Sequence, residues 1–225
     1  MRAPSAVLFD AYGTLFDVHS VAALADAFFP GRGAALSTGW RDKQIEYSRL
    51  VTTSDDGAHY QPFSALTRAG LRYASQRLGL DLTAEREAAL MAQYLRLDAF
   101  AEVRGVLDTL RARGVKTGIL SNGDPAMLEP LVAHAGFDGL IDHLVSVDAV
   151  RRFKTHPDAY RLGVEAMGCA RGDIAFVSSN GWDALGATWY GFRTLWLNRH
   201  GLPAETIGAA PERIGSDLRD VLSFF

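Results

Sequence analysis

A carboxylate stands at the end of an apolar run near the start of the chain. Residues 5–18 read SAVLFDAYGTLFDV, and the residues before Asp10 have the composition of a buried strand. A carboxylate at the end of such a strand costs free energy unless a partner faces it. Thr14 follows shortly after and offers a hydroxyl. Asp10 could simply cap a helix, but the cost of its position suggests a chemical role.

Polar side chains also follow two later apolar segments. Residues 115–120, VKTGIL, and residues 174–178, IAFVS, are typical of strands in the core of a sheet. The polar residues after these segments, or near the helix start between them, are Ser121, Asn122, Lys154, Tyr160, Ser178, Asn180 and Asp183. Ligands of open α/β sheets bind beyond the carboxyl ends of the strands. We therefore expect these side chains to converge on Asp10.

Two different patterns divide the chain. Residues 16–97 carry no strong strand signal, and their helical patterns fall at 21–29, 37–51, 63–80 and 83–97. Further on, strands and helices alternate, with strands at 115–120, 143–147, 174–178 and 192–197. Such alternation indicates a parallel sheet with helices on both faces. The sequence predicts an α/β fold with a core domain, residues 1–15 and 98–225, and a helical cap domain, residues 16–97, inserted after the first strand.

The composition excludes several classes of protein. The 225 residues are 48% hydrophobic, enough for a globular core, and 23 Lys and Arg against 26 Asp and Glu give a net charge of −3. No basic block could follow a nucleic-acid backbone, so we expect no nucleic-acid partner. No apolar run suits a signal peptide or a membrane span, so we expect a cytoplasmic protein. The single cysteine, Cys169, and the absence of zinc-ligand spacing argue against a structural metal.

Four short segments carry a resemblance to a known family. FDAYGTL, LSNGD, FKTHPDAY and SSNGWDALGA resemble the four motifs of the haloacid dehalogenase superfamily, in the same order. Their spelling is similar to that of the L-2-haloacid dehalogenases within it. The similarity spans nearly the whole chain, including GWRDKQIEYSRL in the helical part. The resemblance implies a Rossmann-like core under a helical cap, and a homodimer.

Two departures from the phosphatases of this superfamily point to the dehalogenase branch. Tyr12 stands where the phosphatases place a second acid, and Ser179 stands at the fourth motif where they place an acid that helps to hold Mg²⁺. A leaving alkoxide needs a general acid, whereas a leaving halide is a very weak base and does not. A substrate carrying one carboxylate also has little need of Mg²⁺. We therefore expect neither a metal nor another cofactor.

The resemblance implies roles for individual residues. Asp10 would attack C2 of an (S)-2-haloalkanoate, invert that carbon and form an ester, which water activated by Asp183 would hydrolyse to the (R)-2-hydroxyalkanoate. Lys154 would keep Asp10 ionised, with support from Tyr160. The expected catalytic residues are Asp10, Thr14, Arg41, Lys154, Tyr160, Ser178, Asn180 and Asp183. The expected substrate-binding residues are Tyr12, Arg41, Ile45, Phe63, Ser121, Asn122 and Trp182.

Within this assignment, Arg41 and Asn180 would receive the halide. Ser121 and the backbone N–H groups of Asn122 and Gly123 would bind the substrate carboxylate, and Asp124 would cap the following helix.

Other interpretations stay open at this point. The same fold supports a Mg²⁺-dependent phosphatase, a fluoroacetate-type dehalogenase or a silent binding module. Arg41 has the default alternative of a solvated helix face, and Phe63 and Trp182 that of core aromatics. The preferred chain length, halogen and physiological substrate are open as well.

Overall fold

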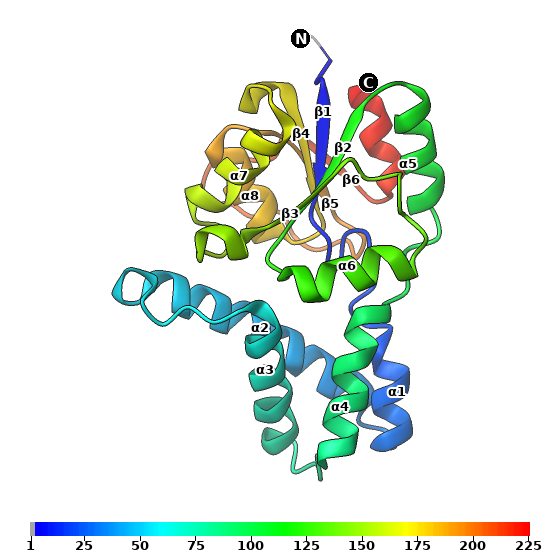
Figure 1. The fold of residues 1–225 in the computed structure, drawn as a ribbon, viewed down its shortest axis with the longest axis vertical. Coiled ribbons are helices and arrows are strands. Elements are labelled where there is room, and N and C mark those ends of the chain that lie inside the picture. The colour runs from blue at the N-terminus through cyan, green and yellow to red at the C-terminus, as the bar shows by residue number, and fades with distance from the viewer. Residues whose placement is uncertain (1–2) are drawn as a thin grey trace.

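A six-stranded parallel sheet forms the centre of the computed structural model, which describes residues 3–225 (Figure 1). The strands lie in the order β3-β2-β1-β4-β5-β6. Their bounds are β1 Ala6–Phe9, β2 Lys116–Ser121, β3 His143–Ser146, β4 Ile174–Ser178, β5 Arg193–Leu197 and β6 Arg213–Gly215. The predicted parallel sheet is confirmed. β6 was not predicted, because its three residues carry no apolar run and are defined only by their pairing with β5.

The first strand lies at the middle of the sheet. β1 pairs in parallel with β2 on one side and with β4 on the other, and all four of its side chains are buried. Parallel strands buried on both faces are continuous apolar runs, as AVLF is here. Because Phe9 pairs with both Ile119 and Val177, the residue after β1 lies between the ends of two neighbouring strands.

Helices cover both faces of the sheet. α7 (Pro157–Met167) and α8 (Gly181–Tyr190) pack against β2 to β5 on one face. α5 (Val103–Ala112) and the short helix η5 (Leu218–Phe224) cover the other face (Figure 1). α6 (Pro125–His134) lies nearest to the remaining helices. Both faces are therefore closed to solvent, and the strand ends are left for the site.

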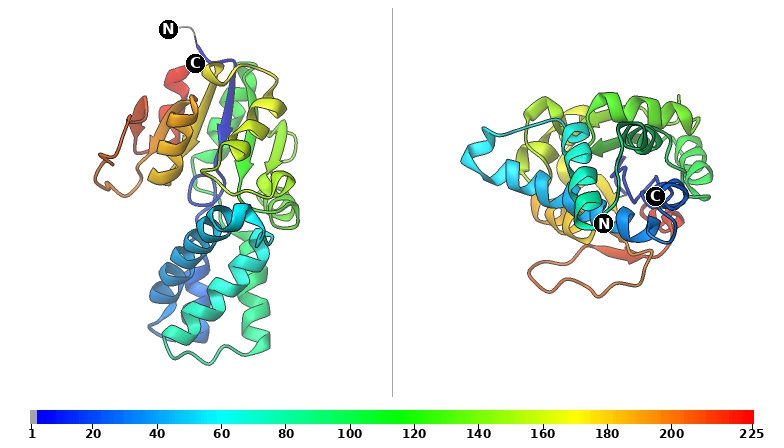
Figure 2. Two further views of the ribbon diagram at one scale, coloured as in Figure 1. Left: turned by 90° about the vertical axis from the view of Figure 1, so that its left-hand side faces the viewer. Right: turned by 90° about the horizontal axis from the view of Figure 1, so that it is seen from below.

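Four further helices lie beyond the carboxyl ends of the strands (Figures 1 and 2). They are α1 (Val21–Phe28), α2 (Gly33–Thr53), α3 (Phe63–Arg77) and α4 (Ala84–Gln93). α2 packs against α1 and α3, and it begins earlier than the pattern at 37–51 predicted. A Cβ on Gly33 would lie 2.4 Å from the carbonyl oxygen of Ala22, so glycine allows α1 and α2 to approach closely. The expected helix 83–97 ends at Gln93 and continues as a short 3-10 turn.

Two linkers connect these helices to the sheet, and they run side by side. The N–H of Asp17 donates to the carbonyl of Asp98 at 2.8 Å, and that of Phe100 donates to the carbonyl of Leu15 at 3.1 Å. Phe16 and Ala99 form an antiparallel bridge between them. The outgoing linker, residues 10–20, and the returning linker, residues 97–102, are thus paired where the chain passes between the sheet and these helices. Among residues 3–225 no helix has the length and apolar character needed to cross a membrane.

Candidate active site

A lysine lies between two carboxylates at the end of β1. Lys154 Nζ is 2.9 Å from Asp10 Oδ1 and 2.9 Å from Asp183 Oδ2. Asp10 directly follows β1, Lys154 precedes α7, and Asp183 lies in the first turn of α8. All three side chains are almost fully buried. Because two anions share one cation, the cluster is held by close pairing and carries a net negative charge.

Burial and charge shift the proton affinities within this cluster. Burial lowers the pKa of Lys154, but the carboxylates of Asp10 and Asp183 outweigh it and hold the pKa above the ordinary lysine value. Burial, with the charge of Asp10, raises the pKa of Asp183, while Lys154 and Tyr160 oppose the rise. The lysine therefore stays an ammonium at neutral pH, and Asp183 is a stronger base than an exposed aspartate.

The second oxygen of Asp10 accepts hydrogen bonds from three side chains. Its Oδ2 is 3.1 Å from Thr14 Oγ1, 3.4 Å from Ser178 Oγ and 2.8 Å from Asn180 Nδ2. These donors come from the loop after β1 and from the end of β4. They fix the orientation of the carboxylate, and the predicted convergence at the strand ends agrees with this geometry.

Tyr160 contacts the opposite side of the cluster. Its hydroxyl donates to Asp183 Oδ1 at 2.8 Å and lies 3.2 Å from the Asp183 carbonyl. Burial raises the pKa of Tyr160 well above its ordinary value, so the phenol keeps its proton and acts as a donor. The contact expected with Lys154 is thus made with Asp183 instead, because α7 and α8 pack side by side.

Arg41 reaches the site from α2. Its Nη2 is 3.2 Å from Asn180 Oδ1 and 3.3 Å from the Tyr12 carbonyl, and its Nη1 is 3.5 Å from Gln44 Oε1. Gln44 is buried, donates to Thr67 at 2.9 Å and accepts from the hydroxyl of Tyr94 at 3.2 Å. Our sequence analysis missed Gln44, although its position one helical turn after Arg41 indicated a shared face.

A narrow pocket opens above Asp10. Its walls include every residue that was expected to bind substrate, joined by Ser48, which was not expected. The lining residues are Asp10, Tyr12, Arg41, Ile45, Ser48, Phe63, Ser121, Asn122, Asn180 and Trp182. The free volume is about 10 Å³, and a cavity needs roughly 10–15 Å³ to hold one water molecule. A larger cavity of about 480 Å³ adjoins this pocket and shares Arg41, Ile45, Asn180 and Trp182 with it.

Several polar groups in the turn after β2 already have hydrogen-bond partners within the protein. Asn122 Oδ1 accepts the N–H of Lys154 at 2.9 Å, which ties the lysine loop to β2. Ser121 Oγ accepts the N–H of Gly123 at 3.1 Å, so this N–H, which was expected to bind a carboxylate, already has a partner. The side chain of Asp124 makes no capping bond to α6. It accepts instead the N–H of Ser64 at 2.8 Å and caps α3 from the core.

The cluster does not fit Mg²⁺. Magnesium prefers an octahedral set of oxygen ligands. Here the ammonium of Lys154 bridges Asp10 and Asp183 at 2.9 Å from each, and the acids of the phosphatases are replaced by Tyr12 and Ser179. Within residues 3–225, no three His, Cys, Asp or Glu side chains are grouped as metal ligands.

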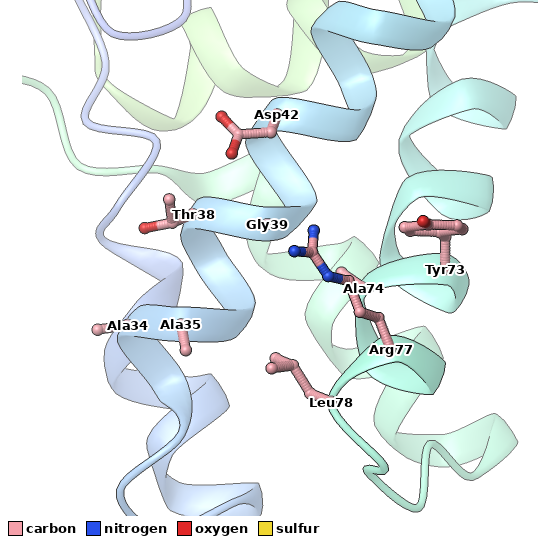
Figure 3. Close-up of a pocket in the computed structure, with 9 residues that line it drawn as sticks. All are labelled: Ala34, Ala35, Thr38, Gly39, Asp42, Tyr73, Ala74, Arg77 and Leu78. Carbon is pink, nitrogen blue, oxygen red and sulfur yellow. The ribbon is translucent and has the colours of Figure 1, made fainter.

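A larger cavity lies elsewhere, in the groove between α2 and α3. It has a volume of about 440 Å³ and shares no residue with the pocket above Asp10. Figure 3 shows the guanidinium of Arg77 extending from α3 toward α2. Small residues of α2, among them Ala35 and Gly39, line the opposite wall. This groove offers neither a paired nucleophile and base nor a buried ion pair.

Comparisons with known proteins agree on one family. Residues 4–191 match the family described as haloacid dehalogenase-like hydrolase. The chain is 45% identical over 219 residues to the (S)-2-haloacid dehalogenase of Pseudomonas sp. (strain YL), covering 97% of this chain and 93% of that protein. The crystal structure of an L-2-haloacid dehalogenase matches with a TM-score of 0.96 and 54% identity over 99% of this chain and 98% of the other.

A second solved structure carries a trapped compound. It is the L-2-haloacid dehalogenase from Xanthobacter autotrophicus with chloropropionic acid covalently bound, with a TM-score of 0.89 and 37% identity over 97% of this chain and 96% of the other. The family match includes Asp10, Lys154 and Asp183. The chain therefore belongs to the haloacid dehalogenase-like hydrolases, and within them to the L-2-haloacid dehalogenases.

Proposed function

We propose that this chain hydrolyses (S)-2-haloalkanoates to (R)-2-hydroxyalkanoates and halide, without a cofactor. The observation that carries the proposal is the carboxylate of Asp10, oriented by Lys154 and three hydrogen-bond donors at the floor of a pocket lined by both polar and apolar side chains. Such a carboxylate is placed to act as a nucleophile. The covalently bound chloropropionic acid of the Xanthobacter relative supports the same chemistry.

The first step forms an ester. A carboxylate oxygen of Asp10 attacks C2 of the substrate opposite the halogen, the carbon–halogen bond breaks, and the halide leaves with the bonding electron pair. Two anions at 4 Å repel by about 4 kcal/mol at an effective dielectric constant of 20. Lys154 and Arg41 supply the positive charge that offsets this repulsion, and backside attack inverts C2.

Different residues of the pocket wall would contact the halide, the alkyl group and the carboxylate of the substrate. Arg41 reaches the pocket from α2 and donates to Asn180 Oδ1 at 3.2 Å, while Asn180 Nδ2 donates to Asp10 Oδ2 at 2.8 Å from the end of β4. The guanidinium of Arg41 and the amide of Asn180 would receive the halide. Tyr12 and Phe63, with ring centroids 5.9 Å apart, offer apolar surface to the alkyl group, as do Ile45 and Trp182. Ser121 and the N–H of Asn122 would bind the substrate carboxylate.

The second step hydrolyses the ester. A water molecule loses its proton to Asp183 and attacks the carbonyl carbon of the Asp10 ester. The bond between that carbon and the product oxygen then breaks, the product oxygen takes the proton held by Asp183, and the new carboxyl of Asp10 releases its proton to solvent. This regenerates both carboxylates and leaves the hydroxyacid with an oxygen from the protein. The raised pKa of Asp183 strengthens it as the general base, and Tyr160 holds it in place.

The closed pocket indicates how substrate gains access. A free volume of about 10 Å³ is too small for a haloalkanoate, and a neighbouring cavity of about 480 Å³ shares Arg41, Ile45, Asn180 and Trp182 with the pocket. We infer that substrate enters from that cavity when the cap, residues 16–97, shifts relative to the core, residues 1–15 and 98–225. The homodimer and the cytoplasmic location that the resemblance and the sequence imply remain predictions. Light scattering of the purified protein will measure its molar mass and so test the homodimer.

Isotope labelling tests the mechanism. In a single turnover of (S)-2-chloropropionate with excess enzyme in H₂¹⁸O, we expect unlabelled lactate of R configuration and one heavy oxygen in Asp10. Asp183→Asn keeps the nucleophile but removes the base, so the ester should accumulate as added mass on the peptide that contains Asp10. Labelled lactate in the first turnover, with no ester in the Asp183 variant, contradicts the covalent mechanism.

A further inference from the structure

Arg199 makes three contacts behind the nucleophile loop. It follows β5 and does not line the pocket above Asp10. Its Nη1 is 2.6 Å from Glu102 Oε1, its Nη2 donates to the carbonyl of Thr14 at 3.0 Å, and its guanidinium lies 3.8 Å from the centre of the Phe100 ring. The side chains of Arg199 and Glu102 are only 11% and 10% exposed. This ion pair is therefore largely shielded from solvent.

One of these contacts leads to the nucleophile through a single residue. Thr14 is fully buried, its hydroxyl donates to Asp10 Oδ2 at 3.1 Å, and its Oγ1 accepts the N–H of Ser179 at 2.8 Å. Arg199 fixes the carbonyl of the same residue. The backbone of Thr14 is therefore held on one side by Arg199 while its side chain orients Asp10 on the other.

The remaining contacts involve the returning linker and the start of α5. Phe100 belongs to the returning linker and donates its N–H to the carbonyl of Leu15 at 3.1 Å, and Glu102 directly precedes α5. The guanidinium thus joins the segment after β5, the loop after β1 and the returning linker. These are the segments that must keep their relative positions if Arg41 of the cap is to lie above Asp10.

We propose that Arg199 is a positioning residue, which holds the returning linker against the nucleophile loop and acts on Asp10 through Thr14. Its role in the reaction rests on the proposed function. The planar fork of arginine serves two partners with two different nitrogens, and a lysine at this position keeps the charge but lacks that fork. The carbonyl of Thr14 then loses its donor, and the Thr14 hydroxyl loses its fixed direction.

The test compares Arg199→Lys with a matched control, Arg193→Lys. Arg193 also belongs to the β5 region, pairs with Glu212 at 2.7 Å and lies over the ring of Phe224 at 5.3 Å, but it is at the opposite end of the strand. We expect Arg199→Lys to slow ester formation in single turnovers about ten- to hundredfold, since a displacement of about 1 Å at a reacting centre can cost about a hundredfold. KM should change less than about twofold, and Arg193→Lys should change neither.

A double variant, Thr14→Val with Arg199→Lys, tests whether Arg199 acts through Thr14. In the Thr14→Val background the hydroxyl that transmits the effect is gone, so Arg199→Lys should add less than about a further twofold loss. If the two losses multiply instead, Arg199 does not act through Thr14 and the proposal is wrong. The proposal is equally wrong if Arg199→Lys forms ester at the wild-type rate.

Amide hydrogen exchange gives a readout that needs no turnover. Arg199→Lys should accelerate exchange in residues 13–16 and 98–102 compared with the wild type, and Arg193→Lys should not. Unchanged exchange in both segments overturns the proposal even in a protein that releases no halide. If the wild-type protein releases no halide but Arg199→Lys still accelerates exchange in these segments, the positioning contact is supported and only the proposed function is contradicted.

Discussion

At the residue scale, the site depends on one cation shared by two carboxylates. Lys154 bridges Asp10 and Asp183, and each carboxylate has its own additional donors. Asp10 is held by the loop after β1 and the end of β4, whereas Asp183 is held by Tyr160 of α7. One carboxylate is thus oriented for attack on carbon, and the other keeps a raised pKa that suits proton removal from water.

Tyr160→Phe tests the proton affinity of Asp183. Burial raises the pKa of Asp183, and the hydrogen bond from Tyr160 opposes that rise. Without this bond the pKa of Asp183 should rise further. Because only the deprotonated carboxylate accepts a proton, the acid limb of the pH profile for ester hydrolysis should move to higher pH.

The alkaline side of the same profile is the internal control. The pKa of Lys154 already lies above the ordinary lysine value, about 10.4, so no loss should occur below that pH in either protein. Stopped-flow measurement of the second step across the pH range gives the result. An acid limb that stays in place or moves to lower pH contradicts the assignment of this limb to an Asp183 carboxylate stabilised by Tyr160.

At the element scale, the distance between α7 and α8 sets the geometry around Asp183. A Cβ on Gly186 of α8 would lie 2.4 Å from Thr155 Cγ2 and 2.7 Å from the Tyr160 hydroxyl. Gly186→Ala should therefore push α8 away from this hydroxyl, destabilise the fold by about 1–3 kcal/mol and slow ester hydrolysis. Thermal melting and single-turnover rates measure the two effects.

Gly105→Ala is the matched helical control. Gly105 lies inside α5, and a Cβ there meets nothing within 4 Å. Alanine should raise the free energy of unfolding by about 0.5–1 kcal/mol, because glycine has more conformational freedom to lose in a helix. Opposite shifts of the melting temperature in the two variants are expected. A neutral Gly186→Ala would show that α7 and α8 can separate without loss.

At the scale of the whole molecule, the departures from the phosphatase pattern predict independence from metal. Dialysis against EDTA should leave halide release from (S)-2-chloropropionate unchanged, because Lys154 supplies the positive charge beside Asp10. With Mg²⁺ added, p-nitrophenyl phosphate should stay intact, since Tyr12 and Ser179 replace the acids that such hydrolysis needs. Strong Mg²⁺-dependent release of phosphate, or loss of halide release with EDTA, would favour the phosphatase interpretation.

The sequence by itself determined the features that depend on local pattern. Alternating strands and helices indicated the parallel sheet, and the apolar runs before Asp10, Ser121 and Ser178 indicated which polar residues follow strand ends. Parallel strands bring their carboxyl ends to one edge, so much of the polar cluster could be expected from spacing alone. The family resemblance added Arg41 to the predicted site. Its helical sequence context alone predicts a solvent-exposed side chain.

The tertiary structure decided what no local pattern contains. Arg41 and Asn180 are separated by 139 positions in the sequence and meet only because α2 lies over the end of β4. Asp124 caps α3 rather than its own helix, and Arg199 contacts Thr14 and Glu102 behind the loop after β1. Periodicity and capping preferences report on neighbours within a few positions, whereas these contacts are fixed by the packing of segments that are distant in the sequence.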